Sequence, residues 1–209
     1  MMLITNNILE TEKLLDEIDG VDFDLDDTLY SEKDYVRSGY RAIAAAYPEI
    51  SGLEEKLWAV FLAGKKAIDE VFAAEGLTEK RQDALALYRS HTPDIHLYEG
   101  VEEMLSRIRK GRQLGIITDG RPEGQRAKIG ALGLEADVII ITDELGGIEY
   151  RKPNEAAFLL MQQRMNIPFE KMVYIGDNPD KDFVAPEKLG MKCILFRNRE
   201  GLYSNTDIR

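Results

Sequence analysis

Five short apolar runs, separated by helical patterns, constrain the fold of this chain more than any other feature. Each run is rich in β-branched or aromatic residues, as the buried strands of a parallel sheet are. The runs are Val21–Leu25, Leu114–Ile117, Val138–Ile141, Met172–Ile175 and Cys193–Phe196. Because strand–helix–strand units cross over with one hand, the pattern predicts an α/β fold with a doubly wound, Rossmann-like parallel sheet. Such a sheet binds its ligand at the carboxyl ends of the strands.

Helical patterns lie between the later runs and before the first one. The expected helices run from about Val101 to Ile108, from a cap at Asn154 to about Met165, and from Lys181 to Leu189. A further helix, with Leu14, Leu15 and Ile18 on one side, is expected before the first strand. It carries no residue of evident chemical use.

Residues 31–96 interrupt the alternation, because they show helical periodicity without a strand. One apolar stripe contains Val36, Tyr40, Ile43 and Tyr47, a second extends from Leu53 to Phe72, and a weaker third contains Leu85 and Tyr88. The pattern predicts a helical insertion at 31–96, with residues 1–30 and 97–209 forming the core. An insertion directly after the first strand could act as a lid over the site.

Composition excludes several classes of protein. The chain has 209 residues, 44% of them hydrophobic, which is enough for a full core. Its net charge of −11 argues against binding to nucleic acid or to an anionic membrane. No stretch approaches the ~18 apolar residues of a membrane span, and the N-terminus does not resemble a signal peptide. We therefore expect a cytoplasmic protein; the sequence makes no prediction of its oligomeric state.

A run of aspartates follows the first predicted strand. The strand would carry Asp24 to its carboxyl end, with Asp26 just beyond it, and two such carboxylates can divide nucleophilic attack and proton transfer. A calcium-binding EF-hand loop is the alternative, but Asp27 stands where the loop needs glycine and Lys33 where it needs glutamate. Asp22 occupies a strand position that is usually apolar, and no role is predicted for it.

Three later strand ends carry complementary groups. Asp177 follows Gly176 after one strand, so it could join Asp24 in supplying oxygen ligands to Mg²⁺. Thr118 and the backbone N–H groups of the loop at Asp119 could bind phosphate oxygens. Lys152, just before a predicted helix, could hold both a phosphate and the nucleophilic carboxylate.

The order of these motifs resembles the haloacid dehalogenase superfamily over roughly residues 20–196. The first motif, Asp-x-Asp-x-Thr, is matched by residues 24–28, and the second, an apolar strand ending in Ser or Thr, by residues 114–118. The lysine of the third motif is Lys152. The fourth motif, Gly-Asp followed by a further acidic residue, is Gly176-Asp177 with Asp182. The insertion resembles the helical C1 cap of this superfamily.

The resemblance implies a mechanism for the first motif. Asp24 would attack phosphorus to form an aspartyl-phosphate, and Asp26 would protonate the leaving alcohol and then activate water. Mg²⁺ would be held by the Asp24 carboxylate, the Asp26 backbone carbonyl and the Asp177 carboxylate.

The resemblance also implies roles for the other motifs. Thr118 and the backbone amide of Asp119 would bind the phosphoryl oxygens, and Lys152 would neutralise charge there. Asp182 would orient Lys152 or a metal-bound water.

Asp26 selects among the activities found in this superfamily. A dehalogenase displaces halide, which needs no proton, so a second aspartate favours phosphate-ester hydrolysis. The sequence thus predicts a Mg²⁺-dependent phosphatase, a phosphoric monoester hydrolase acting on a small phosphorylated metabolite. A phosphomutase of the same superfamily is the alternative. A non-catalytic metal- or phosphate-binding protein is a second alternative, which the intact Asp24, Asp26, Lys152 and Asp177 disfavour.

Overall fold

The computed structural model describes residues 2–202, and within them the chain forms two compact units. One unit is built from the chain up to Glu32 and from His96 onward, and the other is Lys33–Ile95. The first unit contains the sheet, and the second is helical.

The sheet has six parallel strands. They are β1 (Leu3–Thr5), β2 (Gly20–Phe23), β3 (Gln113–Thr118), β4 (Val138–Ile141), β5 (Met172–Gly176) and β6 (Lys192–Phe196), in the spatial order β1-β6-β5-β2-β3-β4. All five predicted strands are present, and the α/β parallel-sheet prediction is confirmed. The sequence did not predict β1, a three-residue edge strand whose Ile4 is exposed.

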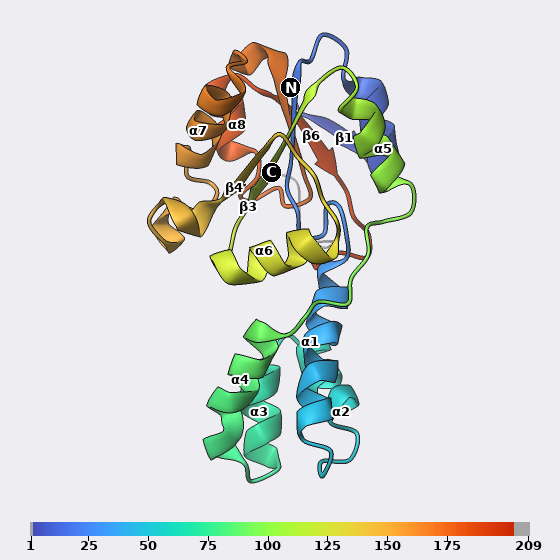
Figure 1. The fold of residues 1–209 in the computed structure, drawn as a ribbon, viewed down its shortest axis with the longest axis vertical. Helices are drawn as coiled ribbons and strands as arrows, with labels where there is room; N and C mark the ends of the chain where they lie inside the picture. Colours follow the sequence, from blue (N-terminus) through green and yellow to red (C-terminus); the bar gives the residue numbers. More distant parts are fainter. Residues whose placement is uncertain (1, 203–209) are drawn as a thin grey trace. The chain divides into compact units, whose positions relative to one another are not determined.

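Helices lie on both sides of this sheet (Figure 1), with α7 and α8 on one side and α5 on the other. Their bounds are α5 (Val101–Ile108), α6 (Pro122–Ala131), α7 (Ala156–Met165) and α8 (Val184–Leu189). The helix expected from Asn154 begins two residues later, with the Asn154 side chain accepting a hydrogen bond from the backbone N–H of Ala156. No sequence pattern singled out α6.

Two helix predictions were wrong in their bounds. The helix expected from Lys181 begins only at Val184, because residues 178–182 form a turn in which Asp182 Oδ2 accepts the backbone N–H of Asn178. The helix expected around Leu14–Ile18 is instead a 3₁₀ segment, Ile8–Leu14. Leu15 and Ile18 are still buried, but they lie beyond the end of that segment.

Apolar side chains of α7 pack against β5 in the core of this unit. Phe158 of α7 makes an edge-to-face contact with Tyr174 of β5, with ring centroids 5.0 Å apart. The central strand β2 pairs with both β3 and β5, so that Phe23 lies between Ile116 and Ile175. The carboxyl ends of these three strands therefore share one edge of the sheet, which is where the predicted site residues lie.

The helical unit contains α2 (Leu53–Leu62), α3 (Ala67–Ala74), α4 (Arg81–Ser90) and nearly all of α1 (Glu32–Ala46). The apolar stripe from Leu53 to Phe72 is divided between α2 and α3, because Gly64 at φ +73° ends the first of them. Tyr47 and Phe72 meet edge to face in the unit's own core, 5.1 Å apart.

Candidate active site

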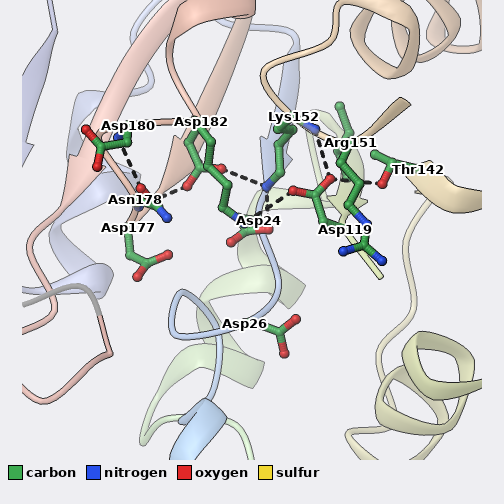
Figure 2. Close-up of polar contacts among 12 residues, drawn as sticks. Asp24, Asp26, Asp119, Thr142, Arg151, Lys152, Asp177, Asn178, Asp180 and Asp182 are labelled. Carbon is green, nitrogen blue, oxygen red and sulfur yellow. Dashed lines mark hydrogen bonds and ion pairs between the residues drawn. The ribbon is translucent and has the colours of Figure 1, made fainter. Parts of the chain in front are cut away.

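Five of the predicted site residues line one cavity of about 310 Å³ at the carboxyl edge of the sheet, namely Asp24, Asp26, Asp119, Lys152 and Asp177. Asp24 follows β2, and its backbone N–H donates to the Ile175 carbonyl at 2.8 Å, which holds it beside β5. Five acidic and three basic residues line the cavity: Asp24, Asp26, Glu32, Asp119, Asp177, Arg151, Lys152 and Lys181. Figure 2 shows most of these side chains.

Lys152 is the centre of the buried part of this cluster (Figure 2). Its Nζ lies 2.6 Å from Asp24 Oδ1 and 2.7 Å from Asp182 Oδ1, and its side chain is fully buried. It also donates to the Tyr174 hydroxyl at 2.7 Å. Burial works to lower the pKa of Lys152, but Asp182 and Asp24 outweigh it and raise the pKa well above the usual value. Lys152 is therefore a fixed positive charge beside Asp24.

Tyr174 is a member of this cluster that sequence reasoning missed. Its hydroxyl accepts from Lys152 and donates to the Ile117 carbonyl at 3.3 Å. A tyrosine within an otherwise aliphatic buried strand was the available signal, since a buried phenol usually needs a hydrogen-bond partner. Tyr174 thus links Lys152 to the sheet.

The environment of Asp24 suits a nucleophile. Burial raises the pKa of Asp24 to about 6, because the opposing charge of Lys152 offsets only part of the effect and Asp182 adds repulsion. The carboxylate is therefore mostly ionised above pH 7 while it is almost fully shielded from solvent. A shielded carboxylate that keeps its charge can attack an electrophile.

Three buried carboxylates could hold a metal ion. Asp24, Asp177 and Asp182 each place one oxygen within 4.8 Å of the others. Burial, followed by repulsion from Asp24 and Asp182, raises the pKa of Asp177 to about 9. An all-oxygen set with surplus negative charge fits a hard divalent cation such as Mg²⁺. This set contains Asp182 in addition to the predicted ligands Asp24 and Asp177.

Gly176 makes the approach of Asp182 possible. A Cβ at this position would lie 2.5 Å from Asp182 Oδ2, so any larger residue would displace that carboxylate. The space that Gly176 leaves allows Asp182 to reach Lys152, with Asp182 Oδ1 2.7 Å from Lys152 Nζ.

Asp26 lies apart from the Lys152 cluster (Figure 2) and has partners of its own. Its Oδ1 accepts from Lys128 Nζ at 2.7 Å and from the Tyr30 hydroxyl, and its Oδ2 accepts from Gln125 Nε2 at 3.1 Å. Burial works to raise the pKa of Asp26, but the charge and hydrogen bond of Lys128, with the hydrogen bonds from Tyr30 and Gln125, lower it below the usual value. Sequence reasoning found none of these three partners.

Thr118 and Asp119 occupy the predicted phosphate-binding loop at the end of β3. Thr118 Oγ1 is buried and makes no hydrogen bond to any residue in the range 2–202, which fits a hydroxyl that binds a substrate oxygen. Asp119 was expected to act through its backbone amide alone. Its carboxylate also accepts from Thr142 Oγ1 at 2.9 Å and from the Lys152 backbone N–H at 3.1 Å, and it pairs with Lys181 Nζ at 3.2 Å. Asp119 therefore connects the loop after β3 with the loops after β4 and β5.

Asp22 is fully buried and outside this network. Neither of its carboxylate oxygens has a hydrogen-bond partner in the part of the chain that the structure describes, and burial raises its pKa to about 8. Gly115 on β3 leaves space for the Asp22 side chain, because a Cβ at this position would lie 2.0 Å from Asp22 Oδ1. A pKa of about 8 keeps most of the Asp22 carboxyl protonated at pH 7.

Among the residues that the structure describes, no helix has both the length and the apolar character needed to cross a membrane.

Comparison with known proteins agrees with this geometry. The model of the haloacid dehalogenase-like hydrolase family matches residues 18–190. Glyceraldehyde 3-phosphate phosphatase of Methanocaldococcus jannaschii is 28% identical over 91% of this chain and 89% of its own length. Phosphoserine phosphatase of Thermus thermophilus is 25% identical over 75% of this chain and 64% of its own length.

A solved structure shows the same fold. A HAD-superfamily hydrolase of subfamily IA from Geobacter sulfurreducens superposes with a TM-score of 0.67 at 17% identity, covering 86% of this chain and 87% of the other. Because the family model spans most of the sequence and the parallel sheet is shared, the chain belongs to the haloacid dehalogenase-like hydrolases.

Proposed function

We propose that this hydrolase is a Mg²⁺-dependent phosphatase that cleaves a small-molecule phosphate monoester through an aspartyl-phosphate on Asp24. The observation that supports it best is the Asp24–Lys152 pair at 2.6 Å, with Asp177 beside it and Asp26 held separately. The phosphatase names of the relatives support the same activity.

In the first step, an Asp24 carboxylate oxygen attacks phosphorus, a P–O bond forms and the bond to the alcohol breaks. The alcohol oxygen takes a proton from the protonated form of Asp26. Lys152, tethered by Asp182 and Tyr174, stabilises the negative charge on the phosphoryl oxygens. The Thr118 hydroxyl and the backbone amide of Asp119 bind these oxygens.

In the second step, water attacks phosphorus, the bond to Asp24 breaks and Asp26 takes the proton from water. The ionised form of Asp26, which Lys128 favours, is the form that can accept this proton. Phosphate leaves and Asp24 is restored as a carboxylate.

Asp24, Asp177 and the Asp26 backbone carbonyl are the proposed holders of Mg²⁺, with Asp182 completing the acidic group. When bound, the cation supplies positive charge that screens the aspartates from an incoming phosphate dianion and polarises it. The cavity supports this proposal, because its lining has five acidic residues and three basic ones.

Substrate choice is proposed to depend on the unit Lys33–Ile95, acting as a helical cap. Within this unit, Arg37 of α1 forms an ion pair with Glu54, and Arg41 forms one with Asp94. A three-carbon alkyl phosphate, such as glyceraldehyde 3-phosphate or phosphoserine, is the first substrate to test. A cytoplasmic location remains a prediction from sequence.

The experiment is a phosphate-release assay with Mg²⁺ over a panel of phosphomonoesters. We expect release from at least one alkyl phosphate, loss of release with EDTA and its return with added Mg²⁺. Isomerisation of a sugar phosphate that depends on a bisphosphate primer, with little free phosphate, would support the phosphomutase alternative instead. Full activity after exhaustive chelation would contradict the metal role.

A further inference from the structure

Helix α6 supplies two buried polar side chains to Asp26. Lys128 Nζ lies 2.7 Å from Asp26 Oδ1, and Gln125 Nε2 lies 3.1 Å from Asp26 Oδ2. The two residues are three positions apart, so they project from the same face of the helix. Lys128 is 5% exposed and Gln125 is 4% exposed. Burying a lysine and an amide is unfavourable without polar partners, and the Asp26 carboxylate serves both.

The donors are divided unequally between the two carboxylate oxygens. Among the residues that the structure describes, Oδ1 accepts from both Lys128 and the Tyr30 hydroxyl, whereas Oδ2 accepts from Gln125 only. Contacts on both oxygens fix the plane of the carboxyl group. Oδ2, with a single donor, is the oxygen with a lone pair available to carry a proton.

Gln125 also ties this arrangement to the proposed phosphate-binding loop. The same Nε2 donates to the Asp119 carbonyl oxygen. Gly120, at φ +138°, leaves the space, since a Cβ there would lie 2.6 Å from Gln125 Nε2. The orientation of Asp26 is thereby coupled to the loop that would hold the phosphoryl group.

We propose that Lys128 and Gln125 are positioning residues that orient Asp26 for proton transfer. The proposal rests on the proposed function, because it requires Asp26 to be the acid and base. Asp26 lines the cavity around Asp24, and Lys128 and Gln125 are not among its lining residues, so we assign their effect to the orientation of Asp26.

The leaving group makes this role measurable. An alkoxide is strongly basic and needs the proton of Asp26 as its bond to phosphorus breaks, whereas p-nitrophenolate is a stabilised anion and leaves without one. The quantity kcat/KM reports on steps up to the departure of the alcohol, so the later need for a base does not enter it. Misorienting Asp26 should therefore lower kcat/KM for an alkyl phosphate and spare p-nitrophenyl phosphate.

The experiment measures kcat/KM of the full-length protein with Mg²⁺ on p-nitrophenyl phosphate and on the alkyl phosphate that the panel shows to be turned over fastest. Lys128→Met should lower the alkyl value by roughly 10- to 100-fold and change the aryl value by less than about threefold. Lys128→Arg should restore part of the alkyl activity. Gln125→Met should show the same selectivity with a smaller loss, and it carries the test if Lys128→Met does not fold.

Arg126→Met is the matched control. It removes a cation from the same helix, but that cation pairs with Glu144 and is 69% exposed, so neither value should change. Equal losses on the two substrates in both Lys128→Met and Gln125→Met would overturn the positioning role.

Asp26→Asn distinguishes a failure of the positioning role from a failure of the proposed function. A fall in kcat/KM confined to the alkyl substrate in Asp26→Asn supports Asp26 as the proposed acid. If Asp26→Asn lowers kcat/KM on the alkyl substrate only, but the Lys128 and Gln125 variants show no difference between the two substrates, the positioning inference alone is overturned. An equal fall in kcat/KM on both substrates in Asp26→Asn would contradict the proposed role of Asp26. It would also overturn the positioning inference.

Discussion

Two of the aspartate–lysine pairs at the carboxyl edge of the sheet, Asp24–Lys152 and Asp26–Lys128, differ in what holds them. In the pair Asp24–Lys152, both side chains are at most 2% exposed, and Asp182 and Tyr174 hold the lysine from β5 and the turn after it. In the pair Asp26–Lys128, the side chains are 18% and 6% exposed, and the lysine comes from α6. The first lysine lies where phosphoryl charge would develop, whereas the second pairs with the proposed proton-transfer group.

This difference gives the two lysines different expected effects. A charge at the phosphoryl group should matter for every substrate, because each passes through the same transfer step. A charge that orients Asp26 should matter only where a proton is needed. The following predictions test this contrast, beginning with the largest effect.

Asp24→Asn should lower kcat by at least roughly 10⁴-fold on both aryl and alkyl phosphates, since the amide has nearly the same shape but is a poor nucleophile. The fold should be kept, because Lys152 retains Asp182 and Tyr174 as partners. Steady-state kinetics and circular dichroism check the two halves of this prediction. Substantial phosphate release by a folded Asp24→Asn protein would exclude Asp24 as the nucleophile.

Lys152→Met should lower kcat/KM by roughly 10²- to 10³-fold, and by the same factor on both substrates. It should also destabilise the protein by ~3–5 kcal/mol, because Asp24 and Asp182 lose their buried counter-charge. Urea unfolding measures this loss. Lys188→Met, which removes an exposed lysine paired with Glu155, is the control and should change neither quantity. A loss selective for alkyl phosphates would remove the distinction between the two lysines.

Tyr174→Phe should have a smaller effect, about 10-fold in kcat/KM, because it removes one hydrogen bond of the charged Lys152 ammonium, worth ~1.5 kcal/mol. Asp182 and Asp24 still hold the lysine. The aryl and alkyl substrates should again be affected alike. A loss as large as that of Lys152→Met would show that the phenol, and not the two carboxylates, controls the lysine.

Asp22→Asn should leave kcat/KM unchanged and alter only the pH dependence of stability. The pKa of Asp22 is about 8 in the folded protein, above its ordinary value, so the folded state binds the proton more tightly than the unfolded state does. Its contribution is therefore fully present at low pH and is lost as pH rises toward 8. The free energy of unfolding should fall less steeply between pH 5 and pH 8 in Asp22→Asn than in the wild type, both measured in urea. Parallel profiles would show that Asp22 does not titrate there.

The sequence predicted the parts of the site that depend on strand ends. Because parallel strands end at one edge, the positions of Asp24, Thr118 and Asp177 followed from the apolar runs before them. Lys152 came from the order of motifs, and the structure brings it to Asp24. The catalytic roles of these residues remain proposals.

The partners of Asp26 could not be found in this way. Lys128 and Gln125 lie 102 and 99 residues from Asp26 in sequence, and no local pattern encodes that contact. Helix α6 contains two glycines and lacks a regular apolar stripe, so its periodicity gave no signal. The edge strand β1 was missed because three residues are too few for a pattern.

The carboxylate of Asp119 was missed for a different reason. A single aspartate in a turn is usually a local feature, and the sequence gives no sign that Thr142, Lys152 and Lys181 converge on it. These contacts join three loops that follow different strands. The parallel order of β5, β2, β3 and β4 in the sheet brings these loops together.

The central claim, that Asp24 carries the phosphoryl group, is tested most directly in the Asp26→Asn variant with p-nitrophenyl phosphate. This leaving group needs no proton, whereas the second step lacks its base, so the intermediate should accumulate. We expect a burst of about one p-nitrophenolate per enzyme and, after acid quenching and peptide mass spectrometry, a phosphoryl group on Asp24. Phosphorylation of a different residue, or turnover with neither a burst nor a phosphorylated peptide, would contradict the account.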